Sequence, residues 1–355
     1  MSETYLEVYI ENIRYNLKNI RKIDQSSMFC AVLKADSYGL GAVNIAKSIE
    51  DDIEYIAVAR LSEAIDLRKN NIKKPILILG YVPVEDIEKC LKYDIDISIY
   101  SLDLARSINE KIDKKINCHL VLDTGHGRIG FRDFEIDKIL KLKDLENINI
   151  ISAFTHFATA DEKDHSYTKL QNEKFNSIIE KVKNNFDFKF VHIANDAGAI
   201  EHSITKDMVR SGISLYGIYP SDYMKDNKKI DLKKAFELYT SISFVKYVEK
   251  GTYISYGRTF KADRKMKIAT VPIGYADGYQ RSFSNCGVML VNGKKARVVG
   301  RVCMDQLMLD VTEIDCKIGD KVVVYPDIYE EAGKIDTIVY ELMTSVNKRV
   351  PRVYK

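Results

Sequence analysis

Two regions with different hydrophobic patterns divide the chain. Up to about Gly217, short apolar runs alternate with amphipathic stretches of helical periodicity. The strand-like runs are MFCAVLK (28–34), EYIAVA (54–59), PILILG (75–80), DISIY (96–100), INCHLVLD (116–123), INIISAF (148–154), FKFVHIA (188–194) and MVRSGISL (208–215). Strands that alternate with helices indicate parallel βαβ units. Eight of them in succession predict an α/β fold of the (β/α)8 TIM-barrel type, with a doubly wound open sheet as the alternative.

After about Leu232 the pattern becomes rich in short β segments separated by turn signals. The Asn-Gly pair at 292–293, between VMLV and KKARVV, predicts a tight β-hairpin. We therefore expect a barrel domain over residues 1–232 and a mainly antiparallel β domain over residues 233–355. A short helix is expected in DTIVYELMTSV (336–346), and residues 1–10 contain a segment, YLEVYI, that could pair with the β domain.

Composition narrows the class of protein. The 355 residues are 46% hydrophobic and 30% charged, which suits a folded chain, and the net charge of +3 gives no sign of a nucleic-acid or membrane partner. No run of about 18 apolar residues predicts a membrane span. The polar start lacks the apolar segment of a signal peptide, so we expect a cytoplasmic location. The six cysteines are scattered without a CxxC pair, which predicts reduced thiols and no metal site.

Polar residues gather at the predicted strand ends, where a barrel carries its active site. These positions hold Lys34, Arg60, Gly80, Tyr100, Asp123-Thr124-Gly125, Thr155-His156, Asn195-Asp196 and Arg210. Lys34 has two interpretations, a solvated rim charge or an amine whose pKa falls on burial. Composition alone favours the rim charge, because lysine is common and mostly exposed. The backbone near Gly212 is a candidate phosphate cradle, as small residues at strand-to-helix turns often are.

Nine sequence motifs follow one another along both predicted domains: AVLKADSYGLG, DTGHGRIGF, THFATADE, HIANDAGAI, VRSGISLYGIYPS, ISYGRTF, VPIGYADGYQR, VGRVCMDQLMLDVT and RVPRVY. Taken together and in this order, they resemble the motifs of the alanine racemase family. Members of that family are pyridoxal-phosphate enzymes with a barrel and a β domain, and AVLKADSYGLG resembles their cofactor-lysine motif. This ordered set overturns the rim-charge interpretation of Lys34.

The resemblance implies roles for individual residues. Lys34 forms the Schiff base and is the base on one face of the substrate, and Tyr256 of the partner subunit is the base on the other, which makes a homodimer with shared active sites part of the mechanism. Arg210 bonds the pyridine nitrogen, and His156 stacks near the cofactor ring. The implied cofactor-binding set is Lys34, Tyr38, His156, Asn195, Arg210, Gly212, Ile213 and Tyr354. The implied substrate-binding set is Arg128, Met304, Tyr275 and Asp305.

Three positions depart from the family pattern. Asp196 stands where the family often has a phosphate-binding serine, so we expect its carboxylate to turn away or to bond another group. Val121 replaces a modifiable lysine that supports the carboxylate-binding arginine, so Arg128 must be held in another way. His126 stands where a methionine is usual. These changes bear on substrate preference and efficiency more than on reaction class.

The resemblance implies a racemase that interconverts L-alanine and D-alanine and supplies D-alanine for peptidoglycan. A broader amino-acid racemase, or a serine racemase, is a close alternative. A pyridoxal-phosphate decarboxylase of the same barrel type is more distant, because decarboxylation does not need Tyr256 opposite Lys34. A non-catalytic protein that binds the cofactor or dimerises is the alternative from another class.

Overall fold

The computed structural model describes residues 4–355 and divides into two compact units. The barrel unit comprises residues 12–37 and 42–233. The β unit comprises residues 4–11, 38–41 and 234–355. The first three residues of the predicted N-terminal segment lie outside the described part. Within residues 4–355, no helix is both long and apolar enough to cross a membrane.

The barrel unit contains eight parallel strands in the order β8-β7-β6-β5-β4-β3-β2-β9, which confirms the predicted fold class. Backbone hydrogen bonds from Arg210 N to Ala194 O (3.1 Å) and from Asp207 N to Val191 O (3.2 Å) bring β9 against β8 and nearly close the barrel. The strands are β2 (Met28–Val32), β3 (Tyr55–Val58), β4 (Ile76–Ile78), β5 (Asp96–Ile99), β6 (Ile116–Val121), β7 (Ile148–Phe154), β8 (Phe190–His192) and β9 (Met208–Ser211).

The predicted last strand is shorter than the sequence pattern suggests. It ends at Ser211, and residues Ile213–Tyr216 form a 3-10 turn, η6. The amides of Gly212 and Ser214 donate to the Asp196 carboxylate rather than to a neighbouring strand, which ends the ladder there.

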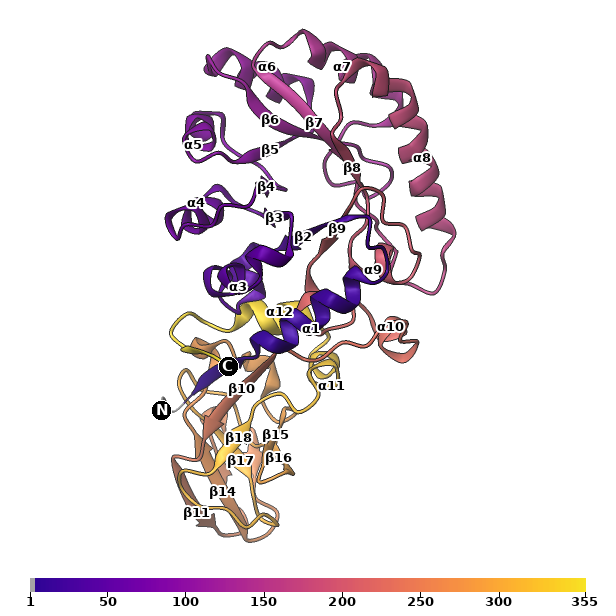
Figure 1. Cartoon of the computed structure of the whole chain (residues 1–355). Coiled ribbons are helices and arrows are strands. Elements are labelled where there is room, and N and C mark those ends of the chain that lie inside the picture. The colour runs from indigo at the N-terminus through magenta and orange to yellow at the C-terminus, as the bar shows by residue number, and fades with distance from the viewer. Residues whose placement is uncertain (1–3) are drawn as a thin grey trace. The chain divides into compact units, whose positions relative to one another are not determined.

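Helices cover the outside of the barrel strands, with α3 to α8 following the strands in turn (Figure 1). The apolar face of α6 packs inward through Leu102, Ala105 and Ile108, and the Ser101 side chain caps its first turn by accepting from Leu104 N. The helices are α1 (Ile10–Arg21), α3 (Ala42–Ile49), α4 (Leu61–Lys69), α5 (Ile87–Lys92), α6 (Leu102–Lys111), α7 (Ile136–Leu140), α8 (Ser166–Val182), α9 (Asp196–Ile200) and α10 (Asp222–Asp226).

The β unit is built on a nine-stranded sheet in the order β11-β14-β17-β16-β15-β18-β10-β1-β19, in which β1 lies antiparallel to β10 and parallel to β19. The predicted Asn-Gly hairpin joins β15 and β16, with Gly293 at φ +77°. The strands are β1 (Tyr5–Val8), β10 (Phe236–Ser241), β11 (Phe244–Val248), β14 (Met266–Val271), β15 (Val288–Val291), β16 (Lys294–Val298), β17 (Leu307–Asp310), β18 (Lys321–Val323) and β19 (Arg352–Tyr354). A two-stranded ribbon, β12 (Tyr253–Ile254) with β13 (Phe260–Lys261), and helices α11 (Ile328–Lys334) and α12 (Val339–Ser345) complete the unit.

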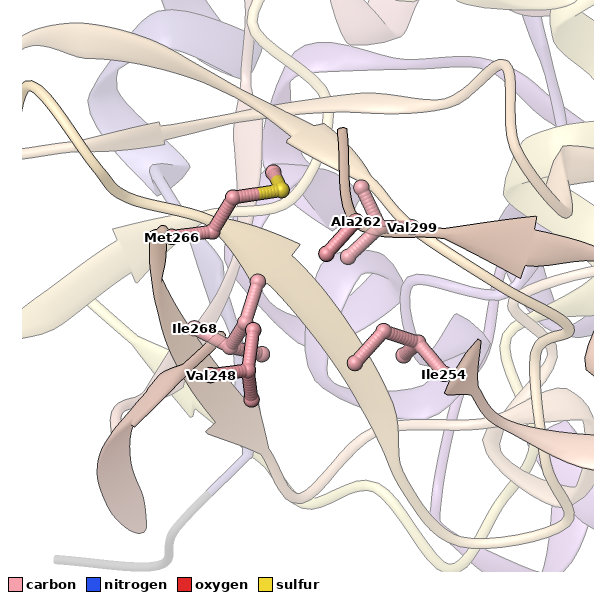
Figure 2. Close-up of a cluster of buried hydrophobic side chains, with 6 residues drawn as sticks. All are labelled: Val248, Ile254, Ala262, Met266, Ile268 and Val299. Atoms are coloured by element: carbon pink, nitrogen blue, oxygen red, sulfur yellow. The ribbon is translucent and has the colours of Figure 1, made fainter. Parts of the chain in front are cut away.

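A hydrophobic cluster packs the ribbon against one end of this sheet (Figure 2). Ile268 on β14 and Val248 on β11 pack beside Ile254 of the ribbon, and all three are at least nine-tenths buried. Burying one such side chain stabilises the fold by about 1.5–3 kcal/mol. The cluster anchors β12, and the residues that follow β12 include Tyr256. The other members of the cluster are Ala262, Met266 and Val299.

Candidate active site

Lys34 lies two residues after the end of β2 and is partly buried among charged groups of the barrel unit. Its pKa is lowered, mainly because burial disfavours the charged amine and also because Arg128 and Arg210 repel it. Glu63 opposes this shift. An amine with a lowered pKa is a better nucleophile and proton carrier near neutral pH than a solvated lysine.

Glu63 was not among the sequence-predicted site residues. It lies in the first turn of α4, and its carboxylate accepts from Ala35 N at 2.6 Å and from Ala59 N at 2.8 Å. It therefore holds the backbone beyond Lys34 against the end of β3. The sequence contains a signal for this role, because Glu63 comes three residues after the strand-end residue Arg60. That is the spacing at which a glutamate caps the first turn of a helix.

The backbone after Lys34 makes a left-handed turn. Four successive non-glycine residues have positive φ: Ala35 (52°), Asp36 (55°), Ser37 (54°) and Tyr38 (55°). Each costs roughly 1–2 kcal/mol relative to a right-handed conformation. Two hydrogen bonds help to hold the turn, from Ser37 N to Leu33 O (2.9 Å) and from Ala42 N to the Asp36 carboxylate (2.8 Å). Strain of this kind is often kept at functional sites, and here it fixes the exit of the chain from Lys34.

Residues 38–41, downstream of this turn, belong to the β unit. The Tyr38 ring lies 6.0 Å from the ring of Tyr340, and Leu40 O accepts from the Tyr354 hydroxyl at 3.1 Å. Gly39 O accepts from Arg352 Nε at 2.9 Å. Two predicted phosphate ligands, Tyr38 and Tyr354, are thus brought into one unit by residues from opposite ends of the chain.

Arg210 is buried at the end of β9, and the structure fixes both ends of its guanidinium group. Nη1 lies 2.8 Å from His192 Nδ1, and Nη2 donates to Thr155 O at 2.8 Å and lies 3.3 Å from His156 Nδ1. Burial lowers the pKa of Arg210 to about 10, so the group stays charged at neutral pH. It is a fixed cation that can only donate hydrogen bonds.

A buried chain of polar groups continues from Arg210 into the barrel. His119 Nδ1 lies 3.1 Å from His192 Nε2, His119 Nε2 lies 3.4 Å from the Tyr55 hydroxyl, and Tyr55 donates to Asp96. Because arginine has no acceptor, His192 Nδ1 must accept, and a neutral His192 then carries its proton on Nε2 and donates to His119. Burial holds the pKa of His192 well below its usual range, in agreement with the neutral form.

His156 and His126 lie side by side next to this cation, with ring centroids 5.4 Å apart. Burial, Arg210 and Arg128 hold the pKa of His156 well below its usual range, so His156 is neutral at pH 7. Burial and Arg128 also lower the pKa of His126. The departure at His126 therefore adds a second, neutral ring rather than another positive charge.

Arg128 lies in the loop after β6 and is exposed. Val121 stands where the family pattern has a lysine that supports the arginine, and its side chain is buried and apolar. In the part of the chain that the structure describes, the Arg128 guanidinium has no hydrogen-bond or ion-pair partner within its own chain. It is therefore available to a substrate carboxylate. The prediction that another group holds it stays untested.

Asp196 is fully buried and does not turn away from the predicted phosphate cradle. Its carboxylate accepts from Ser211 Oγ at 2.6 Å, from Gly212 N at 3.0 Å and from Ser214 N at 3.2 Å. The amide of Ile213 also stabilises it. It does bond other groups, as expected, but two of them are the amides that the resemblance assigns to a phosphate. Asn195 is occupied as the cap of α9, where its side chain accepts from Gly198 N at 2.8 Å.

The remaining predicted residues lie on the surface of the β unit in a single chain. The exposed fraction is 70% for Tyr256, 43% for Tyr275 and 53% for Met304. Asp305 pairs with Arg349 Nη2 at 2.7 Å, and the same arginine binds Asp277 through Nε at 2.7 Å. Among residues 4–355, no cluster of three or more His, Cys, Asp or Glu side chains could hold a metal ion.

Comparison with known proteins identifies the family of the chain. Residues 8–220 match the family model described as the alanine racemase N-terminal domain, and residues 235–354 match the alanine racemase C-terminal domain. An alanine racemase of Clostridium tetani is 45% identical, with 99% of this chain and 95% of that protein covered. One of Methanococcus maripaludis is 41% identical, with 99% and 98% covered. The solved alanine racemase of Clostridium difficile 630 superposes with a TM-score of 0.94 at 39% identity, over 100% of this chain and 96% of that one. The chain belongs to the alanine racemase family.

Proposed function

We propose that this protein interconverts L-alanine and D-alanine with pyridoxal phosphate, using Lys34 and Tyr256 of the partner subunit as two bases. The observation that carries the proposal is Lys34 itself. It is an amine with a lowered pKa at a barrel strand end, within the fields of Arg128 and Arg210, in a chain of this family.

The residues of the barrel unit fit the ring and the amine end of the cofactor. Lys34 can reach the deprotonated form needed to bond the cofactor's aldehyde, and Arg210 offers a fixed cationic donor to a ring nitrogen. Ser214 supports the phosphate end, because its hydroxyl is buried without a hydrogen-bond partner among the described residues and follows the Gly212 and Ile213 amides. When bound, the cofactor withdraws electrons from the substrate's α-carbon.

Racemisation removes the α-proton from one face and returns a proton to the other, so two acid–base groups are needed. Lys34 Nζ serves one face. The Tyr256 hydroxyl of the partner subunit serves the other. Exposure of Tyr256 in the single chain supports its use by a second copy, and the exposed Met304 and Tyr275 are consistent with the same interface.

Arg128 orients the substrate by binding its carboxylate. An unpaired guanidinium can do so through two parallel hydrogen bonds. Arg210 would leave the pyridine nitrogen unprotonated, because a charged guanidinium can only donate a hydrogen bond to it. By doing so Arg210 would weaken the electron withdrawal that the bound cofactor supplies, which would disfavour side reactions such as transamination.

We further propose a homodimer, a cytoplasmic location and a role in supplying D-alanine for peptidoglycan. The test of the activity is direct. Purified protein loaded with pyridoxal phosphate is given L-alanine, L-serine and longer L-amino acids, and the enantiomers are separated by chiral chromatography. D-alanine formed faster than the other D-amino acids supports the proposal. No D-product from any of them refutes it.

A further inference from the structure

The cradle expected to hold the cofactor's phosphate already contains a negative group that belongs to the chain. Asp196 lies at the start of α9, and its two carboxylate oxygens take three hydrogen bonds from the segment 211–214. The bond from Ser211 is short, at 2.6 Å, and every member of the cluster is at least nine-tenths buried. Asp196 is therefore an internal anion that occupies the same donors as an incoming phosphate.

The charged groups around Asp196 do not neutralise it. Arg210 precedes Ser211 on β9, but its guanidinium is used by His192, His156 and Thr155 O. The phenol of Tyr216 interacts with Asp196, but burial raises the pKa of Tyr216 far above neutral, so it contributes no charge. Glu201, at the other end of α9, is paired with Lys229 at 3.0 Å. No cation thus bonds the Asp196 carboxylate among the described residues.

Two anions cannot share these donors without a proton. A phosphate dianion beside an ionised, buried Asp196 would suffer repulsion in a region of low dielectric. A neutral carboxylic acid has the opposite character, because it gains an O–H donor and can bond a phosphate oxygen as a serine hydroxyl does. Burial already raises the pKa of Asp196 in spite of its three hydrogen bonds, so the neutral acid is accessible.

We propose that Asp196 binds the cofactor's phosphate as the neutral acid, so that cofactor binding takes up one proton and weakens as the pH rises. The proton comes from solvent and is held on the Asp196 carboxyl. The phosphate remains a dianion and accepts hydrogen bonds from the backbone amides of the segment 211–214. The inference rests on the proposed function only in taking pyridoxal phosphate as the ligand. It concerns binding, not turnover.

The sign of the pH dependence follows from linkage. In the free protein Asp196 ionises above its own pKa, and in the complex the neighbouring phosphate raises that pKa further. Between the two values, binding requires a proton, and the dissociation constant rises by up to about tenfold per pH unit. At lower pH both states are protonated and this dependence disappears.

The experiment titrates cofactor-free protein with pyridoxal phosphate by calorimetry from pH 6 to pH 8.5, in buffers of different ionisation enthalpy. Asp196→Ser and the isosteric Asp196→Asn are the matched variants, and pyridoxal, which lacks the phosphate, is the matched ligand. We expect the wild type to take up more protons than either variant, by up to about one, in the part of this range that lies between the two pKa values of Asp196. At pH 8.5 both variants should bind pyridoxal phosphate about tenfold more tightly than the wild type, and the gap should shrink toward pH 6. Pyridoxal should show no such difference.

Binding of inorganic phosphate provides a second, independent measurement on the same site. Without the Asp196 carboxylate, the donors of the segment 211–214 lack their partner, so phosphate should raise the melting temperature of cofactor-free Asp196→Ser more than that of the wild type. Equal proton uptake and equal pH dependence in wild type and variants would overturn the proposal. Protein that never takes up pyridoxal phosphate would overturn it together with the proposed function. A chain that binds the cofactor with the predicted linkage but forms no D-amino acid would refute only the function.

Discussion

The guanidinium of Arg210 lies 2.8 Å from Nδ1 of His192 in the interior of the barrel, and both side chains are buried. The pair fixes which nitrogen of His192 carries its proton, and through His119 it links the cation to Tyr55 and Asp96 on β3 and β5. Arg210 is thus positioned in part by side chains of the barrel interior, His192 directly and His119 through it. Substitutions in this chain of groups test how far the site depends on the barrel interior.

Replacing His192 with Phe should destabilise the protein by about 1–3 kcal/mol at pH 7, because the ring volume is kept but a buried arginine loses its acceptor. The folded His192 has a pKa well below the usual value near 6.5, so the unfolded chain binds more protons below that pH. Its contribution to stability is therefore complete above about pH 6.5 and is lost as the pH falls.

Urea unfolding of wild type and His192→Phe at pH 7, 6 and 5 measures this. The difference in the free energy of unfolding between wild type and His192→Phe should decrease on acidification, by up to about 1.4 kcal/mol per pH unit, because only the wild type has this group to protonate. A gap that stays constant from pH 7 to pH 5 would show that His192 is not held neutral.

Lys34→Ala should abolish the absorbance at about 420 nm that a lysine-bound pyridoxal group gives. The same substitution should abolish the racemase activity. Lys47→Ala is the matched control, because Lys47 is an exposed lysine on α3. Both variants should retain the wild-type circular dichroism spectrum. A Lys34→Ala protein that keeps the band would show that another amine holds the cofactor.

Use of Tyr256 by the partner subunit can be tested with mixed dimers. Lys34→Ala and Tyr256→Phe homodimers should each be nearly inactive in both directions. A heterodimer of the two variants has one site with Lys34 and Tyr256 both native and one site with neither. Random pairing makes half of the dimers heterodimers, so co-expression should restore about a quarter of the wild-type activity per active-site equivalent. If Tyr256 served its own chain, no native site could form and activity would stay at background.

Gly39 has little room for a side chain. Its φ is +87°, and a Cβ there would lie 2.6 Å from the carbonyl oxygen of Met343. Gly293 in the β15–β16 hairpin has a similar φ of +77° with no atom within 4 Å, so it isolates the backbone strain. Gly293→Ala should cost roughly 1–2 kcal/mol, and Gly39→Ala should cost at least about 1 kcal/mol more. If thermal unfolding shows that Gly39→Ala and Gly293→Ala lose the same amount of stability, the segment 38–41 can shift to accommodate a Cβ at little cost.

The barrel was predictable because its buried strands are continuous apolar runs bounded by turns. The predicted strand 148–154 coincides with β7, and most of the other predicted strands differ from the structure only at their ends. Lys34 and Arg210 could be placed at strand ends for the same reason, since parallel strands end on one face of the barrel. The family resemblance then supplied the role of each residue.

The features of the site that the sequence did not predict depend on contacts between distant parts of the chain or on backbone strain. The partners of Arg210 come from different strands, and nothing local marks His119 or His192 as more than core residues. The left-handed turn is made of Ala35, Asp36, Ser37 and Tyr38, of which only Asp36 readily adopts positive φ. Charge repulsion suggested that Asp196 would turn away from the predicted phosphate cradle or bond another group, and the second alternative is confirmed. The sequence pattern did not indicate that the amides of Gly212 and Ser214 would themselves donate to this carboxylate.

The central claim is that the α-proton of alanine is removed on one face and replaced on the other. It is tested most directly by incubating the enzyme with L-alanine in deuterium oxide and following both enantiomers by mass spectrometry and chiral chromatography. We predict that D-alanine forms with deuterium at the α-carbon and that the carboxyl group is retained. Release of carbon dioxide, or recovery of L-alanine with no D-enantiomer and no label, would contradict the account.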